Sequence, residues 1–100
     1  MRGVPPDPEA AGDELSRLRD RIEALDREIV ALVAQRVRLA REVGTVKRAA
    51  GLPPRDAARE QAVLERTAEL ARVEGLPEAE MRRLFTHLIE ISRHAQQASD

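Results

Sequence analysis

The chain contains 100 residues, no cysteine and a formal net charge of -1, with acidic and basic side chains interspersed along it. This length allows one small domain with a modest core, and the lack of cysteine excludes disulfides and thiolate chemistry. The balanced charge offers no basic field for nucleic acid and no polybasic segment for a membrane, so we expect neither as a partner.

The composition predicts an all-α protein. Alanine, glutamate, arginine and leucine dominate, and Phe85 is the only aromatic residue. Apolar residues recur with a period of about 3.5, which is typical of long helices.

Residues 1–12 are rich in proline and lack periodicity. We therefore expect a disordered arm, followed by one domain over residues 13–100. The arm has no apolar run after its arginine, which argues against a signal peptide or a membrane anchor. The cytoplasm is the expected location.

The first helix is predicted over residues 13–50, where an apolar heptad seam is interrupted by no proline. A helix of roughly 37 residues is about 55 Å long, whereas a compact chain of this size has a radius of gyration of about 13 Å. We therefore expect a second copy to cover the helix in an intertwined homodimeric bundle. The seam consists of Leu15, Leu18, Ile22, Leu25, Ile29, Leu32, Leu39, Val43 and Val46.

Two shorter helices are predicted after the stretch "AGLPPRD", whose glycine and prolines end the first helix. Asp56 is placed to cap a helix over residues 56–74, and Gly75 supplies its C-terminal stop. Pro77 suits the first turn of a third helix, over residues 77–98. The buried face of this helix is expected to contain Met81, Leu84, Phe85, Leu88, Ile89 and Ser92.

Several polar residues occupy positions where the helical pattern predicts apolar ones. Arg36 follows Leu32 in the seam, and Lys47 lies about three turns further along the same face. Lys47 is also the only lysine, which indicates either a need for a compact ammonium group at this position or chance on a solvated face. Ser92 and Gln96 extend the buried face of the third helix by one turn.

These residues are expected to form one pocket. Short connections make consecutive helices antiparallel neighbours. The start of the second helix therefore lies at the same end of the bundle as the C-terminal parts of the other two. The expected pocket contains Arg36, Lys47, Asp56, Arg59, Glu60, Ser92 and Gln96.

Arg19 is expected to complete the pocket of a second copy. On its own helix Arg19 points about 100° away from Arg36, so the two side chains should not share a site within one chain. If two copies of the helix cross antiparallel near residue 32, Arg19 of one lies opposite residue 45 of the other, to within about one residue.

Each of these residues also has an ordinary structural interpretation. A lone arginine in a seam more often sets helix register or extends to solvent. Ser92 and Gln96 can fray into solvent, and Asp56 and Glu60 can serve as a cap and a dipole partner. Their convergence favours a site, because buried cations without matching buried acids are costly unless an outside anion pairs with them.

The expected pocket holds no nucleophile with a neighbouring base, no metal-ligand cluster and no glycine-rich phosphate loop, and His87 and His94 lie outside it. It offers a polycationic clamp for a small di-anion, a carboxylate for a hydroxyl, and donors from Lys47 and Gln96. Such a site either binds a small di-anion or catalyses a reaction of it by positioning and electrostatic stabilisation.

Residues 15–97 resemble the all-α, AroQ-type (class II) chorismate mutases in three segments, "LRDRIEALDREIVALVAQRVRLAREVGTVK", "PPRDAARE" and "LIEISRHAQQ". The resemblance implies a homodimer of three-helix chains that rearranges chorismate to prephenate in the pathway to phenylalanine and tyrosine. This pericyclic reaction needs no cofactor and no metal.

The resemblance also implies how the substrate carboxylates are bound. Arg36 and the partner's Arg19 would hold the two carboxylates, and Arg59 would support the positive field around them. Ser92 would lie beside one carboxylate.

The reacting bond and the ring hydroxyl would be contacted by the remaining residues. Lys47 and Gln96 would donate to the ether oxygen, where negative charge grows as the carbon–oxygen bond breaks. Glu60, assisted by the backbone near Asp56, would accept the ring hydroxyl. The resemblance therefore assigns catalysis to Lys47, Gln96, Arg36 and Glu60.

Two other functions stay open at this point. A relative with the same fold would act on isochorismate or on aminodeoxychorismate, although the intact "RDAARE" and Ser92 favour the mutase. A protein of another class would be a non-catalytic helical dimerisation module, in which Arg36 sets register and Lys47 lies on the surface.

Overall fold

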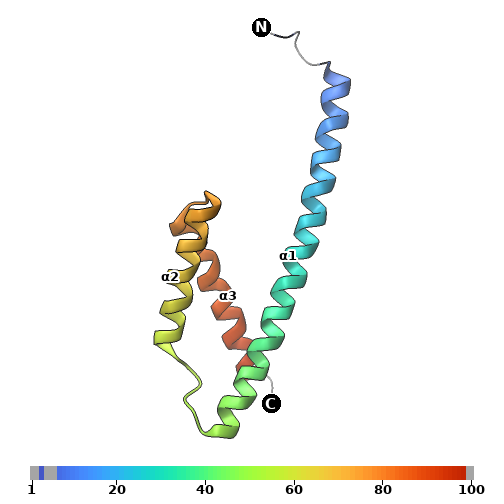
Figure 1. Cartoon of the computed structure of the whole chain (residues 1–100). Coiled ribbons are helices and arrows are strands. Elements are labelled where there is room, and N and C mark those ends of the chain that lie inside the picture. Colours follow the sequence, from blue (N-terminus) through green and yellow to red (C-terminus); the bar gives the residue numbers. More distant parts are fainter. Residues whose placement is uncertain (1–2, 4–6, 99–100) are drawn as a thin grey trace. The chain divides into compact units, whose positions relative to one another are not determined.

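The computed structural model describes residue 3 and residues 7–98, which form three helices (Figure 1). These are α1 (Pro8–Ala50), α2 (Ala57–Glu74) and α3 (Glu78–Ala98). No strand occurs within the described ranges, so the prediction of an all-α fold is confirmed. None of the three helices combines the length and the apolar character that a membrane crossing requires.

The first helix begins earlier than predicted, at Pro8 instead of residue 13. Proline is tolerated in the first turn because that turn needs no N–H donor. Asp7 precedes it, and its carbonyl accepts from the Ala11 N–H at 2.9 Å. The expectation of a disordered arm is therefore wrong for residues 8–12, while residues 1–2 and 4–6 lie outside the described part of the chain.

The chain divides into two compact units, Met1–Leu32 and Val33–Asp100. In the described part of the first unit, α1 carries its heptad seam without a covering element. The seam side chains are between 44% and 61% exposed, namely Leu15, Leu18, Ile22, Leu25, Ile29 and Leu32. This apolar face has the spacing of a helix that packs against another helix.

The core of the second unit lies where α2 and α3 run side by side in opposite directions (Figure 1). Its buried apolar residues are mostly small, namely Val63, Ala68, Ala71, Ile89 and Ala95. Asp56 caps α2, as predicted, by accepting from the Arg59 N–H at 3.0 Å. Gly75 ends α2 with a φ of 73°, and α3 follows after Pro77.

Within the second unit, α1 presents two different faces. Small residues of the inner face are partly or fully buried, namely Val33, Val37, Ala40 and Gly44. The seam residues Leu39, Val43 and Val46 stay between 47% and 64% exposed. At about 100° per residue, Arg36 and Lys47 lie at the border between these faces.

Gly44 permits a close approach between α1 and α3. A Cβ at this position would lie 3.1 Å from Cγ of Gln96.

Leu84 departs from the expected buried face of α3, because it is 49% exposed.

We expect Gly75→Ala to lower the free energy of unfolding by about 1 kcal/mol, because alanine is strained at positive φ. Gly12→Ala is the control. Gly12 lies inside α1 with open space around its Cα, so alanine there should raise the free energy by about 0.5–1 kcal/mol. Urea unfolding at one protein concentration measures both. Equal effects of the two substitutions would contradict the αL assignment.

Candidate active site

A cavity of about 310 Å³ lies in the second unit, among the C-terminal part of α1, the start of α2 and the end of α3. Seven of the eight residues expected in the site line this cavity, namely Arg36, Lys47, Asp56, Arg59, Glu60, Ser92 and Gln96. Arg19 belongs to the first unit and does not line it.

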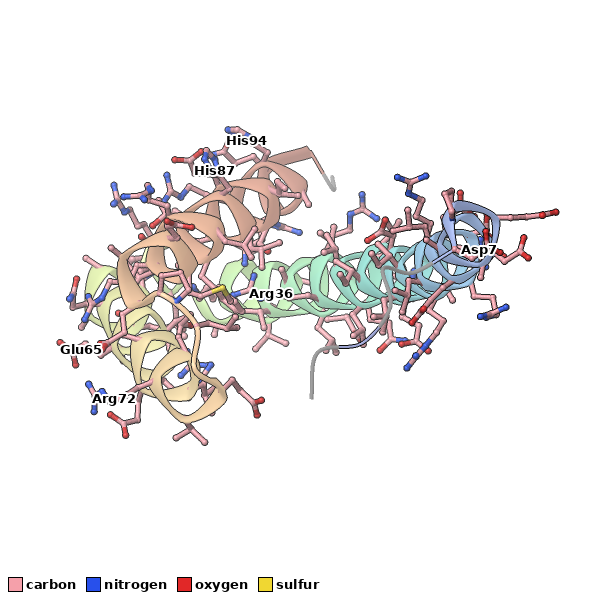
Figure 2. The ribbon with its side chains drawn as sticks, turned by 90° about the horizontal axis from the view of Figure 1, so that it is seen from above. Asp7, Arg36, Glu65, Arg72, His87 and His94 are labelled. Carbon is pink, nitrogen blue, oxygen red and sulfur yellow. The ribbon has the colours of Figure 1, made fainter. Side chains whose placement is uncertain are left out.

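Arg36 reaches from α1 to α3, as Figure 2 shows. Its Nη1 donates to Oγ of Ser92 at 2.7 Å and, more weakly, to the Leu88 carbonyl at 3.4 Å. Ser92 is only 7% exposed. The shorter bond fixes one end of the guanidinium on a buried hydroxyl and leaves its other donors for a ligand.

The charge of Arg36 is poorly balanced by its surroundings. Burial lowers the pKa of its guanidinium, and the nearby positive charges of Arg66 and Arg59 lower it further. Among the described residues, no carboxylate lies within 4.0 Å of Arg36 to form an ion pair. An anion from outside would relieve both the repulsion and the desolvation.

Lys47 and Gln96 form another part of the wall, and both are partly buried. The Lys47 ammonium donates to the Pro54 carbonyl at 3.1 Å, which ties the end of α1 to the loop before α2. Gln96 packs against Gly44, since a Cβ there would also lie 3.3 Å from Cβ of Gln96. Both side chains therefore bring hydrogen-bond donors to the same cavity.

The acidic residues of the cavity play different parts. Asp56 is exposed and uses its side chain to cap α2. Glu60 is more enclosed, with 23% of its side chain exposed, and one carboxylate oxygen accepts from both Arg93 and Arg55. Glu60 is thus the carboxylate most firmly oriented toward the cavity.

Two charged lining residues were missed from the sequence, Arg66 and Arg93. Arg66 lies two turns after Arg59 on α2, so the helical period places both side chains on the same face and could have predicted Arg66. Arg93 follows Ser92, but nothing in its spacing separates it from an arginine on a solvated face. These two residues add two more cations to a site already expected to be positive.

Neither histidine lines the cavity. Figure 2 shows His87 and His94 on the outer side of α3, away from Arg36, and both are exposed. Within the described residues, no group of three or more histidine, cysteine or acidic side chains is arranged to hold a metal ion. The cavity instead combines anion-binding cations, neutral donors and one oriented carboxylate.

The sequence is similar to proteins whose names include chorismate mutase. It is 43% identical over 84 residues to the bifunctional chorismate mutase/prephenate dehydratase of Escherichia coli, a match that covers 84% of this chain and 22% of the relative. The chain thus spans about a fifth of that protein. The chorismate mutase of Methanocaldococcus jannaschii is 30% identical, over 84% of this chain and 85% of the relative.

A solved structure is also similar. A conserved hypothetical protein from Pyrococcus furiosus matches with a TM-score of 0.68 and 30% identity, over 83% of this chain and 95% of that one. Residues 18–97 match the family described as chorismate mutase type II. Since this match covers most of the chain, the resemblance noted in three sequence segments is confirmed, and the chain belongs to the chorismate mutase type II family.

Proposed function

We propose that this protein catalyses the Claisen rearrangement of chorismate to prephenate in the biosynthesis of phenylalanine and tyrosine. The observation that carries the proposal is the charge of Arg36. This side chain is partly buried and is repelled by the nearby Arg66 and Arg59, and no carboxylate in the described part of the chain lies within 4.0 Å of it. Chorismate brings two carboxylates to such a site. The names of the relatives support the same reaction.

Binding of the carboxylates would fix the reactive conformation of the substrate. Arg36 is the proposed partner of one carboxylate, with Ser92 beside it and Arg59 and Arg66 adding to the positive field. The partner's Arg19 is the proposed ligand of the other carboxylate. Holding both ends of a flexible molecule converts a rare compact conformer into the bound one, which lowers the barrier of a unimolecular reaction.

Lys47 and Gln96 are the proposed donors to the ether oxygen of chorismate. In the rearrangement, the ether carbon–oxygen bond breaks while a carbon–carbon bond forms within the same molecule. Negative charge grows on the oxygen in the transition state, so a donor there gains strength as the reaction proceeds. One such donor in an enclosed site typically supplies about 3–4 kcal/mol of barrier reduction.

Glu60 is the proposed acceptor for the ring hydroxyl. Its carboxylate is held at the cavity by contacts from α3 and from the loop before α2. The backbone near Asp56, at the start of α2, is proposed to assist it. None of these steps requires a proton transfer or a cofactor.

A homodimer is proposed because no described element of the chain covers the apolar seam of α1. The seam residues are about half exposed in both units. An antiparallel partner helix would bury them, and it would also bring Arg19 of each copy to the cavity of the other. Each apolar side chain that becomes fully buried contributes about 1.5–3 kcal/mol.

The rival functions explain fewer observations. A dimerisation module accounts for the exposed seam but not for four arginines gathered around one cavity. Enzymes acting on isochorismate or on aminodeoxychorismate share most of the proposed contacts and differ in the group that meets Glu60.

The cytoplasmic location stays a prediction.

We expect the purified protein to convert chorismate to prephenate, and Arg36→Ala to lower kcat/KM by at least about 30-fold, since removing one partner of an enclosed charge pair costs about 2–5 kcal/mol. Loss of chorismate absorbance with product identification measures both. Lack of turnover by the unaltered protein would refute the proposal.

Lys47→Ala is expected to lower kcat by about 100–1,000-fold while changing KM much less, because the lost hydrogen bond strengthens in the transition state. Steady-state kinetics at saturating chorismate separates the two constants. A variant with a raised KM and an unchanged kcat would assign Lys47 to ground-state binding instead.

Mixing two inactive variants tests the shared site. In a dimer formed from Arg19→Ala and Arg36→Ala chains, one site keeps both arginines and the other loses both. If the variants exchange subunits at random, we expect about a quarter of the unaltered activity to return. Mixtures as inactive as the separate variants, after demonstrated subunit exchange, would show that Arg19 acts within its own chain.

A further inference from the structure

We propose that Arg93, assisted by Arg55, makes the cavity selective for a substrate whose ring carries an uncharged hydroxyl and against one whose ring carries an ammonium group. This inference rests on the proposed function and extends it to substrate choice. Neither arginine was among the residues expected in the site.

The geometry around Glu60 places two cations on one of its oxygens. Nη2 of Arg93, from α3, lies 3.3 Å from Oε1 of Glu60, and Nη2 of Arg55, from the loop before α2, lies 3.4 Å from the same oxygen. Within the described residues Oε2 has no hydrogen bond. One oxygen is therefore anchored, and the other remains to accept from a ligand.

The local charge decides what Oε2 accepts. A lone carboxylate would attract an ammonium group more strongly than a hydroxyl. Here one negative charge is accompanied by two positive charges, so an ammonium bound at Oε2 would also be repelled by Arg93 and Arg55. A neutral hydroxyl donates to the same oxygen without that repulsion, so the like charges act against the wrong substrate.

Arg93 should contribute more to this discrimination than Arg55. Its side chain is 33% exposed against 63% for Arg55, so water and salt screen its charge less. Its Nε is buried and has no hydrogen-bond partner in the described part of the chain. Arg93 also lines both the 310 Å³ cavity and a neighbouring cavity of about 540 Å³, whereas Arg55 lines only the second.

The alternative role for Arg93 is purely structural. In that case it would orient Glu60, and its removal would impair every substrate alike. The two roles differ in one measurable quantity, the ratio of kcat/KM for the amino substrate to kcat/KM for the hydroxy substrate.

The test compares chorismate with 4-amino-4-deoxychorismate as substrates of the 100-residue chain. Arg93→Gln is expected to raise the amino-to-hydroxy ratio of kcat/KM by about tenfold or more. Arg93→Lys keeps the charge and is expected to leave the ratio within about threefold of the unaltered protein. Arg55→Gln is expected to produce a smaller rise than Arg93→Gln, because its charge is more exposed.

Arg83→Gln provides the matched control, since Arg83 is exposed on α3 and lines neither cavity. Equal losses for both substrates in Arg93→Gln, or an unchanged ratio, would overturn the inference while the proposed function stands. A preference of the unaltered protein for the amino substrate would also overturn it. Failure of the unaltered protein to consume chorismate would refute the proposed function itself. If Arg93→Gln does not fold, the charge-conserving variant still tests the inference. A rise of about tenfold or more in the amino-to-hydroxy ratio of kcat/KM in Arg93→Lys would overturn it.

Discussion

The bond between the Arg36 guanidinium and the buried hydroxyl of Ser92 is the interaction around which the cavity is organised. It places a cation where Arg66 and Arg59 already add positive charge. Burial lowers the pKa of Arg36, and these two nearby charges lower it further. The fold therefore maintains an unfavourable charge arrangement when no ligand is bound. An anion would stabilise such an arrangement, which supports the proposed role of Arg36 as the partner of a substrate carboxylate.

The rest of the second unit keeps this arrangement in place. Small residues between α2 and α3 let these helices pack closely, and Gly44 lets α1 approach Gln96. The cap at Asp56 starts α2 where Glu60 can face the cavity. Because the apolar seam of α1 remains exposed, helix packing within one chain and the proposed association between chains would use different faces of the same helix.

Much of this could be predicted from the sequence, because helical periodicity reports which residues share a face. The break at "AGLPPRD" and the cap at Asp56 located the second helix, and the polar interruptions at Arg36 and Ser92 located the cavity. The earlier start of α1 was missed because proline content was taken to indicate disorder. Arg93 was missed because its role depends on Glu60, from another helix, and spacing within α3 carries no information about that contact.

The most direct test of the account is the thermal unfolding of the unaltered protein and of Arg36→Leu, each with and without prephenate. A ligand present at about 100 times its Kd stabilises a one-site protein by about 2.7 kcal/mol. The account predicts that prephenate raises the Tm of the unaltered protein and leaves that of the folded Arg36→Leu variant unchanged. Equal protection of both proteins, or protection of neither, would contradict the claim that Arg36 is held for an anionic ligand.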